Sequence, residues 1–182
     1  MKNKILSTSL IVAIALGLSG CATTGTTGIN TSTGEGEARA AGYFPATRPA
    51  TGHKIFIFSP QAHAYAAYDA NGNRVRTGKA SGGQDFCPDI GQPCRTATGT
   101  YRVNAKGDAD CISHIFPIET GGGAPMPYCM KFGGQGFAIH GSYDVPEDSN
   151  ASHGCIRVTP ESARWLSQNF VDIGTTVYVM PY

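Results

Sequence analysis

Short apolar runs separated by turn-forming residues fill most of the chain after residue 53. A run at residues 55–58 is followed by one at 64–68, a turn string at 69–73 and a further run at 74–77. Runs of this length bounded by Gly, Pro, Asn and Asp are typical of strands joined by hairpins. Further strands are predicted at residues 100–103, 136–139 and 176–180.

One clear helical pattern appears near the C-terminus. Ala163, Leu166 and Phe170 follow helical spacing and share one face, and Thr159 or Pro160 can begin the helix. The sequence therefore predicts a mostly antiparallel β domain with a late helix packed on it.

The N-terminus has the residue order of a secretory signal. Lys2 and Lys4 precede a mostly apolar stretch at residues 5–18, and small residues follow it. The stretch is shorter than the roughly 18 to 20 residues that a membrane-spanning helix needs. We expect residues 1–20 to be a signal peptide and the chain to be exported.

Cys21 ends the string Leu18-Ser19-Gly20-Cys21, which resembles a bacterial lipobox. This resemblance implies that Cys21 carries lipid and anchors the chain to the periplasmic face of the envelope, at the outer membrane if the organism is Gram-negative. The alternative is an ordinary signal cleaved nearby, with Cys21 free or in a disulfide.

Composition changes sharply after Cys21. Residues 22–50 are rich in Thr, Gly, Ser and Ala, so residues 21–51 are predicted to form a flexible tether and residues 52–182 a single domain. Loss of residues 1–20 removes two of 14 basic side chains, leaving 12 against 13 acidic ones. This balance argues against a nucleic-acid partner, and we expect a monomer.

The remaining five cysteines are an odd number in a chain expected to meet an oxidising environment. Cys87 and Cys94 bracket one loop and Cys111 and Cys129 another, so these pairs are predicted disulfides, although four cysteines allow three pairings. The histidine and cysteine spacings do not match common zinc sites, and no metal is expected.

Cys155 is the cysteine left over. It lies in the string Ser152-His153-Gly154-Cys155, downstream of His140 at the end of an apolar run. A thiol becomes a strong nucleophile as thiolate, and a nearby imidazole or cation favours that form. The alternatives are a buried structural cysteine or a disulfide with Cys21.

These strings resemble the active-site signature of the L,D-transpeptidase catalytic domain, the YkuD-like family. The matching residues are His140-Gly141 and the string at residues 152–157, and the resemblance extends over residues 52–182. It implies a β-sandwich with one or two short helices. Three departures stand out: Ala97 replaces a common proline, the linker at 141–151 is short, and the extra cysteines suggest a disulfide-braced cap over the substrate.

The resemblance also implies roles for the site residues. His140 is the general base, its ring oriented by the carbonyl of Gly141 or Ser142, and Cys155 attacks to form a thioester. Backbone N–H groups at Gly154 and Cys155, with His153 nearby, stabilise the oxyanion.

Four residues are candidates for substrate binding: Ser152, Gly141, Arg157 and Tyr128. Arg157 can bind a substrate carboxylate or form an internal ion pair, of which the internal pair is slightly favoured. Tyr128 can line the cleft or pack in the core.

The implied reaction cleaves an L,D bond in a peptidoglycan stem peptide and transfers the acyl group to an amine, without a cofactor. Transfer to a second stem peptide gives a crosslink, which we expect, whereas a protein lysine gives wall attachment and water gives carboxypeptidase activity. A non-catalytic peptidoglycan-binding module is the alternative of another class, although a pure binder needs no base beside a thiol.

Overall fold

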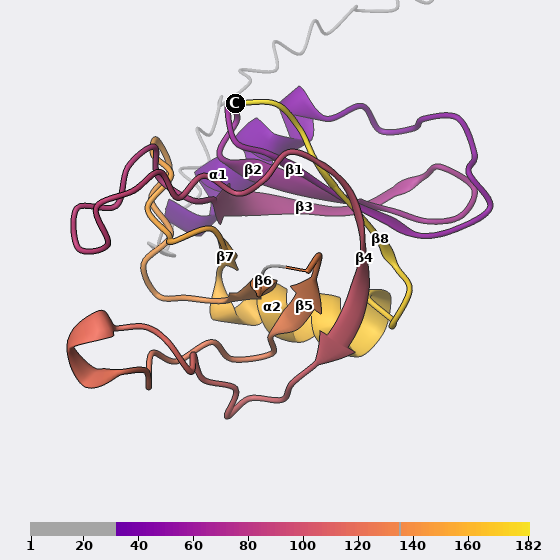
Figure 1. Cartoon of the computed structure of the whole chain (residues 1–182). Coiled ribbons are helices and arrows are strands. Elements are labelled where there is room, and N and C mark those ends of the chain that lie inside the picture. The colour runs from indigo at the N-terminus through magenta and orange to yellow at the C-terminus, as the bar shows by residue number, and fades with distance from the viewer. Residues whose placement is uncertain (1–31, 135) are drawn as a thin grey trace, which may run out of the picture.

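The computed structural model describes residues 32–134 and 136–182 (Figure 1). Its helices are α1 (Ser32–Tyr43), the 3-10 turn η1 (Ile118–Thr120), α2 (Pro160–Trp165) and the π-helical turn η2 (Leu166–Phe170). Its strands are β1 (Ile55–Ser59), β2 (Ala64–Tyr68), β3 (Arg74–Ser81), β4 (Gly99–Lys106), β5 (Met130–Phe132), β6 (Phe137–Gly141), β7 (Ile156–Val158) and β8 (Thr176–Val179).

The eight strands form one closed sheet in the order β1-β2-β3-β7-β6-β5-β4-β8. The pairs β1–β8 and β6–β7 are parallel, and the other pairs are antiparallel. The predicted mostly β, mostly antiparallel fold is confirmed, and its sandwich-like sheet closes on itself. Closure leaves none of these strands as a free edge.

The main core fills the inside of this sheet and is closed by the late helix. Phe56, Phe132, Ile139 and Ile156 are fully buried there, and Leu166 packs among them from η2. Burying a side chain of this size contributes about 1.5–3 kcal/mol.

The late helix begins as the sequence predicts. Thr159 is the N-cap, its hydroxyl accepts a hydrogen bond from the Ser162 N–H, and Pro160 occupies the first helical position. Proline is well suited to that position because its missing N–H would have no helical partner there. The prediction of this helix is confirmed.

The prediction of a flexible tether at residues 21–51 is wrong for its second half. Helix α1 packs on β2 and β3, and Ala40 and Phe44 are buried in a second apolar cluster. The Arg74 guanidinium donates to the Ala41 carbonyl (2.7 Å), and the Tyr68 hydroxyl donates to the Pro45 carbonyl (2.7 Å). Residues 21–31, including Cys21, lie outside the described part of the chain.

Residues 32–43 are rich in alanine and glycine, so they show too little apolar periodicity for a helix to be predicted there. Its stability comes from packing on the strands, as it does for most short helices in proteins. Among the described residues, no helix combines the length and the apolar character that crossing a bilayer requires.

Both predicted disulfides are present, Cys87–Cys94 and Cys111–Cys129. They close two loops: the segment at residues 87–94, hereafter the short loop, and the segment at 111–129, hereafter the long loop. The short strands β5 and β7 were not predicted, because three residues carry too little pattern, yet β7 begins directly after Cys155.

Candidate active site

The parallel pairing of β6 with β7 places the segments that carry the two principal candidates side by side. His140 lies opposite Arg157, and Ile139 lies opposite Ile156 in the core. His140 and Arg157 therefore share one face of the sheet, and Cys155 lies directly before β7, two residues ahead of Arg157.

This face borders a cavity of about 430 Å³. Both His140 and Cys155 line it, so the structure brings the predicted base and nucleophile together in one accessible space. The long loop supplies much of the rest of its lining, including Phe116, Pro125 and Met126, and Phe137 of β6 also contributes.

The His140 ring is buried, with 6% of the residue exposed, and its orientation is fixed by its own strand. Its Nδ1 lies 2.9 Å from the Gly141 carbonyl oxygen. A carbonyl can only accept, so Nδ1 carries the hydrogen and Nε2 keeps a free lone pair. Burial lowers the pKa of His140 to about 4, against the opposing effect of the Gly141 hydrogen bond. His140 is therefore neutral at neutral pH, and its Nε2 can accept a proton.

Cys155 is the one cysteine among those described that is not in a disulfide, and it stays partly exposed. Burial raises the pKa of its thiol, and the Ala138 backbone hydrogen bond and the Arg157 charge oppose this only in part. The expectation that neighbouring groups favour a thiolate is therefore wrong for the resting state. Thiol and imidazole are both neutral, and the thiol needs a base at the moment of attack.

The turn before Cys155 is organised by Ser152. The Ser152 hydroxyl donates to the Cys155 carbonyl (2.6 Å) and accepts from the Gly154 N–H (3.0 Å). Ser152 is buried, and its hydroxyl is used inside the turn. The Gly154 N–H, predicted to stabilise an oxyanion, is already hydrogen-bonded, so the Cys155 N–H is the remaining predicted donor.

Gly154 is required by its geometry. Its φ is 113°, and a Cβ added there would lie 2.6 Å from the Phe137 ring. Gly141 is similarly confined, because a Cβ would lie 3.0 Å from the Pro127 side chain and 3.1 Å from the Pro160 backbone. Close packing, rather than substrate contact, accounts for glycine at both positions.

His153 contacts both disulfide-closed loops. Its Nε2 lies 2.7 Å from an Asp89 carboxylate oxygen of the short loop, and its ring stacks on Phe116 of the long loop with 4.2 Å between centroids. Neither Asp89 nor Phe116 was found by sequence reasoning. Their place inside the two cysteine-bracketed loops was the available signal, but only the fold shows that both loops meet at His153.

Arg157 and Tyr128 are placed differently from each other. Arg157 donates to the Asp144 carboxylate (2.7 Å), which is the internal ion pair of its two interpretations. Asp144 is largely exposed, so the pair adds little stability. Tyr128 packs against the main core and is not among the described residues that line the cavity.

Three potential metal ligands gather beside the cavity. Donor atoms of Cys87, Asp89 and His153 lie within 4.8 Å of one another. The Cys87 sulfur belongs to a disulfide and cannot ligate as a thiolate, so this cluster does not make a metal site.

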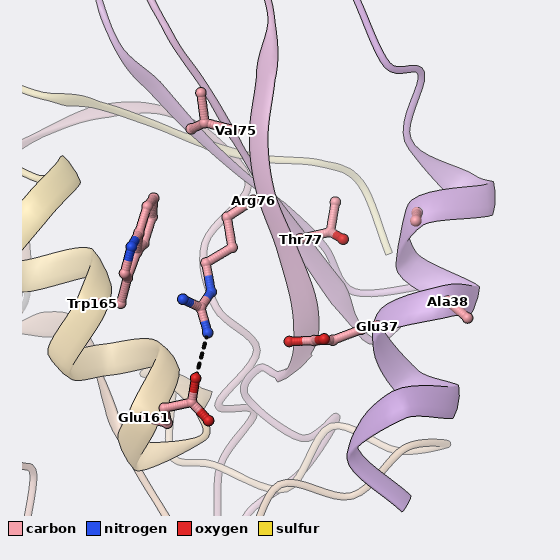
Figure 2. A pocket seen from close by; sticks show the side chains of 8 residues that line it. Glu37, Ala38, Val75, Arg76, Thr77, Glu161 and Trp165 are labelled. Atoms are coloured by element: carbon pink, nitrogen blue, oxygen red, sulfur yellow. Dashed lines mark hydrogen bonds and ion pairs between the residues drawn. The ribbon is translucent and has the colours of Figure 1, made fainter. Parts of the chain in front are cut away.

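A larger, more open hollow of about 700 Å³ lies between α1 and α2 over β3 (Figure 2). The Arg76 guanidinium there pairs with Glu161 (2.9 Å) and lies 5.0 Å from the centroid of the Trp165 ring. Its lining holds no thiol or imidazole, so the smaller cavity is the candidate active site.

Residues 52–179 match the family model of the L,D-transpeptidase catalytic domain. An L,D-transpeptidase structure from Xylanimonas cellulosilytica is 27% identical, with a TM-score of 0.61, and the match covers 75% of this chain and 65% of that one. An L,D-transpeptidase from Mycobacterium smegmatis is 22% identical, with a TM-score of 0.58 over 71% of this chain and 59% of that one.

L,D-transpeptidase 3 from Mycobacterium tuberculosis, solved with a faropenem-derived adduct, is 22% identical, with a TM-score of 0.58 over 70% of this chain and 60% of that one. The chain thus spans less than two thirds of the length of each of these structures. A comparison with curated proteins found no match. The family model covers well over half of the chain, and the chain belongs to the L,D-transpeptidase catalytic domain family.

Proposed function

We propose that this protein is a cysteine-dependent L,D-transpeptidase that acts on peptidoglycan stem peptides through a thioester and forms crosslinks. The observation that carries the proposal is that His140, on β6, and Cys155, directly before β7, line one cavity large enough for a peptide segment. Family membership supports the same reaction class.

The first step joins proton transfer to attack. The Cys155 thiol is neutral at rest, so His140 Nε2 takes its proton as sulfur adds to the carbonyl carbon of the L,D bond. His140 then gives that proton to the departing amine of terminal D-Ala as the C–N bond breaks. An acyl thioester on Cys155 and a neutral imidazole remain.

The negative charge on the tetrahedral oxygen needs hydrogen-bond donors. The Cys155 N–H is the backbone donor on which this proposal rests, because the Gly154 N–H already donates to Ser152.

The second step transfers the acyl group to an acceptor. An amine of a second stem peptide attacks the thioester while His140 accepts its proton, and the Cys155 thiol is released. The same thioester can react with a protein lysine or with water, which would make the protein a wall-attachment enzyme or an L,D-carboxypeptidase. A muropeptide digest with and without the protein identifies the acceptor from its products.

Mass spectrometry of the intact protein tests the acyl-enzyme. A Cys21→Ser background removes the one cysteine that lies outside the described residues, and the protein is then mixed with a stem tetrapeptide or a carbapenem. We expect an adduct that maps to Cys155, is absent in Cys155→Ala, and forms far more slowly in His140→Ala. A reduced Cys155 that acquires no adduct would sink the enzyme proposal and leave the binding module.

We also propose that the chain is exported and lipid-anchored through Cys21. Its two disulfides support an oxidising compartment outside the cytosol. Cys21→Ser should release the protein from membranes, and unchanged membrane partitioning of this variant would contradict the anchor.

A further inference from the structure

We propose that Asp89 is a positioning residue for the acyl transfer, acting through His153 on the turn that carries Cys155. This inference rests on the proposed function. It concerns a carboxylate from a loop that a disulfide closes.

The contact between the two side chains is short and directional. The Asp89 carboxylate can only accept, so at 2.7 Å it takes the hydrogen of His153 Nε2. Their side chains are 33% and 24% exposed, so the pair is better shielded than an exposed pair such as Asp85–Arg95. In a neutral His153 this contact fixes the hydrogen on Nε2 and leaves Nδ1 as an acceptor.

The backbone of the segment that carries Asp89 is hydrogen-bonded to the turn at residues 152–155, hereafter the catalytic turn. The Ser152 N–H donates to the Gly82 carbonyl (2.9 Å), and the Gln84 N–H donates to the Ser152 carbonyl (3.0 Å). Within the loop, the Cys87 N–H donates to the Gln92 carbonyl (2.9 Å) beside the disulfide. Asp89 thus lies on a backbone segment whose position relative to the catalytic turn is fixed by these hydrogen bonds.

Phe116 restrains His153 from its other side. The two rings stack at 28°, and Phe116 comes from the long loop. His153 is therefore confined by a hydrogen bond and by a stacked ring from two different loops.

The reason this restraint matters lies in the next residue. Gly154 separates His153 from Cys155 and adopts a positive φ, which glycine reaches without strain but also leaves easily. Strand β7 fixes the chain after Cys155. Before Gly154 the turn is held by the Ser152 hydroxyl and by the two contacts of the His153 ring. Loss of the Asp89 contact should let the turn, and with it the sulfur, move away from its attack position.

Asp85 provides a matched control in the same segment. Its carboxylate pairs with Arg95 at 2.7 Å, but both side chains are largely exposed, and neither residue lines the cavity. Asp85→Ala removes the same charge without touching His153.

The experiment compares the rate of Cys155 acylation by a carbapenem in Asp89→Ala, Asp89→Asn and Asp85→Ala, each in the Cys21→Ser background. We expect Asp89→Ala to slow acylation about tenfold or more, since displacements of about 1 Å cost up to about a hundredfold. Asp89→Asn should stay within about threefold, because its amide oxygen accepts the same hydrogen bond, and Asp85→Ala should match the parent protein. Imidazole ¹⁵N spectra should show His153 with hydrogen on Nε2, and this signature should be lost in Asp89→Ala.

Acylation at the parent rate in Asp89→Ala, with the Nε2 signature lost, overturns the proposal. Equal losses in Asp89→Ala and Asp89→Asn also overturn the hydrogen-bond account. If Asp89→Ala does not fold, Asp89→Ser replaces it, since a serine side chain is too short to reach His153. A parent protein whose reduced Cys155 never acylates would instead defeat the proposed function, so the two failures are distinguishable.

Discussion

The two disulfide-closed loops meet at His153, yet they are built differently. In the short loop both cysteines are buried, and the adjoining backbone exchanges hydrogen bonds with the catalytic turn. In the long loop Ile112, Ile115 and Ile118 are exposed, the last two at 61% and 43%. The long loop contributes much of the cavity wall and reaches His153 through Phe116.

The two loops therefore have different roles: the short loop supports the catalytic turn, and the long loop covers the cavity. The backbone beside the short loop is hydrogen-bonded to the catalytic turn, whereas the long loop lines the cavity that a substrate would enter. The two disulfides should therefore have different effects, and each effect can be measured by removing one bond at a time.

Removal of the Cys111–Cys129 bond should give the largest loss of stability. The bond spans 18 residues, and the chain-entropy model then predicts about 3 kcal/mol of destabilisation. Acylation of Cys155 should change only a few-fold in Cys111→Ala/Cys129→Ala, because the catalytic turn keeps its supports. Urea unfolding and carbapenem kinetics on the same preparation check both parts.

His140 should show a pH effect of similar size that belongs to neither loop. Its pKa is about 4 in the folded chain and near the usual 6.5 when unfolded, so between these values the unfolded chain binds a proton that the native one does not. Stability should therefore fall by about 3 kcal/mol as pH drops from about 6.5 to 4. The free energy of unfolding is measured against pH in the parent protein and in His140→Asn. The fall in stability between about pH 6.5 and 4 that His140 causes should be absent in the variant. The same fall should persist in both disulfide variants, and its loss in either would mean that the loops also fix His140.

Removal of the Cys87–Cys94 bond should lower stability less than removal of Cys111–Cys129, but it should slow acylation of Cys155 more. Its separation of 7 residues corresponds to about 2 kcal/mol in the same model. We expect acylation in Cys87→Ala/Cys94→Ala to fall about tenfold, through loss of the Asp89 position. If acylation instead slowed more on removal of Cys111–Cys129 than on removal of Cys87–Cys94, the proposed difference between the two loops would be wrong.

Phe116→Ala should have the smallest effect, about threefold on KM for a stem peptide, with kcat nearly unchanged. The ring borders the cavity and stacks on His153, and Asp89 still restrains His153 without it. Ile118→Ala is the control, because Ile118 lies on the same loop but is not among the described cavity residues. Steady-state kinetics of both variants give the answer.

The features that could be predicted from the sequence are the longer strands, the late helix and the two disulfides, which depend on local residue patterns and on the positions of the cysteines. The strands of the main core alternate or run apolar for four or more residues, and the late helix has a capping threonine followed by proline. The disulfide pairs followed from which cysteines bracket a loop. Strands β5 and β7 were missed because three residues show no period.

What the sequence missed in the site depends on tertiary contacts. The raised pKa of Cys155 follows from burial, which no neighbouring residue in the sequence reveals. Asp89 precedes His153 by 64 residues and meets it only because the short loop is bonded to the catalytic turn. Helix α1 was missed for the same reason, since Ala40 within it and Phe44 just after it are buried only by their contact with the strands.

The docking of α1 also limits how far the domain can travel. A tether over residues 21–51 could extend about 100 Å, but with the chain fixed from Ser32 onward only residues 21–31 are left between the proposed lipid and the folded body. Eleven residues span at most about 40 Å. With Cys21 embedded in a membrane, the cavity would reach only the layer of wall nearest that membrane.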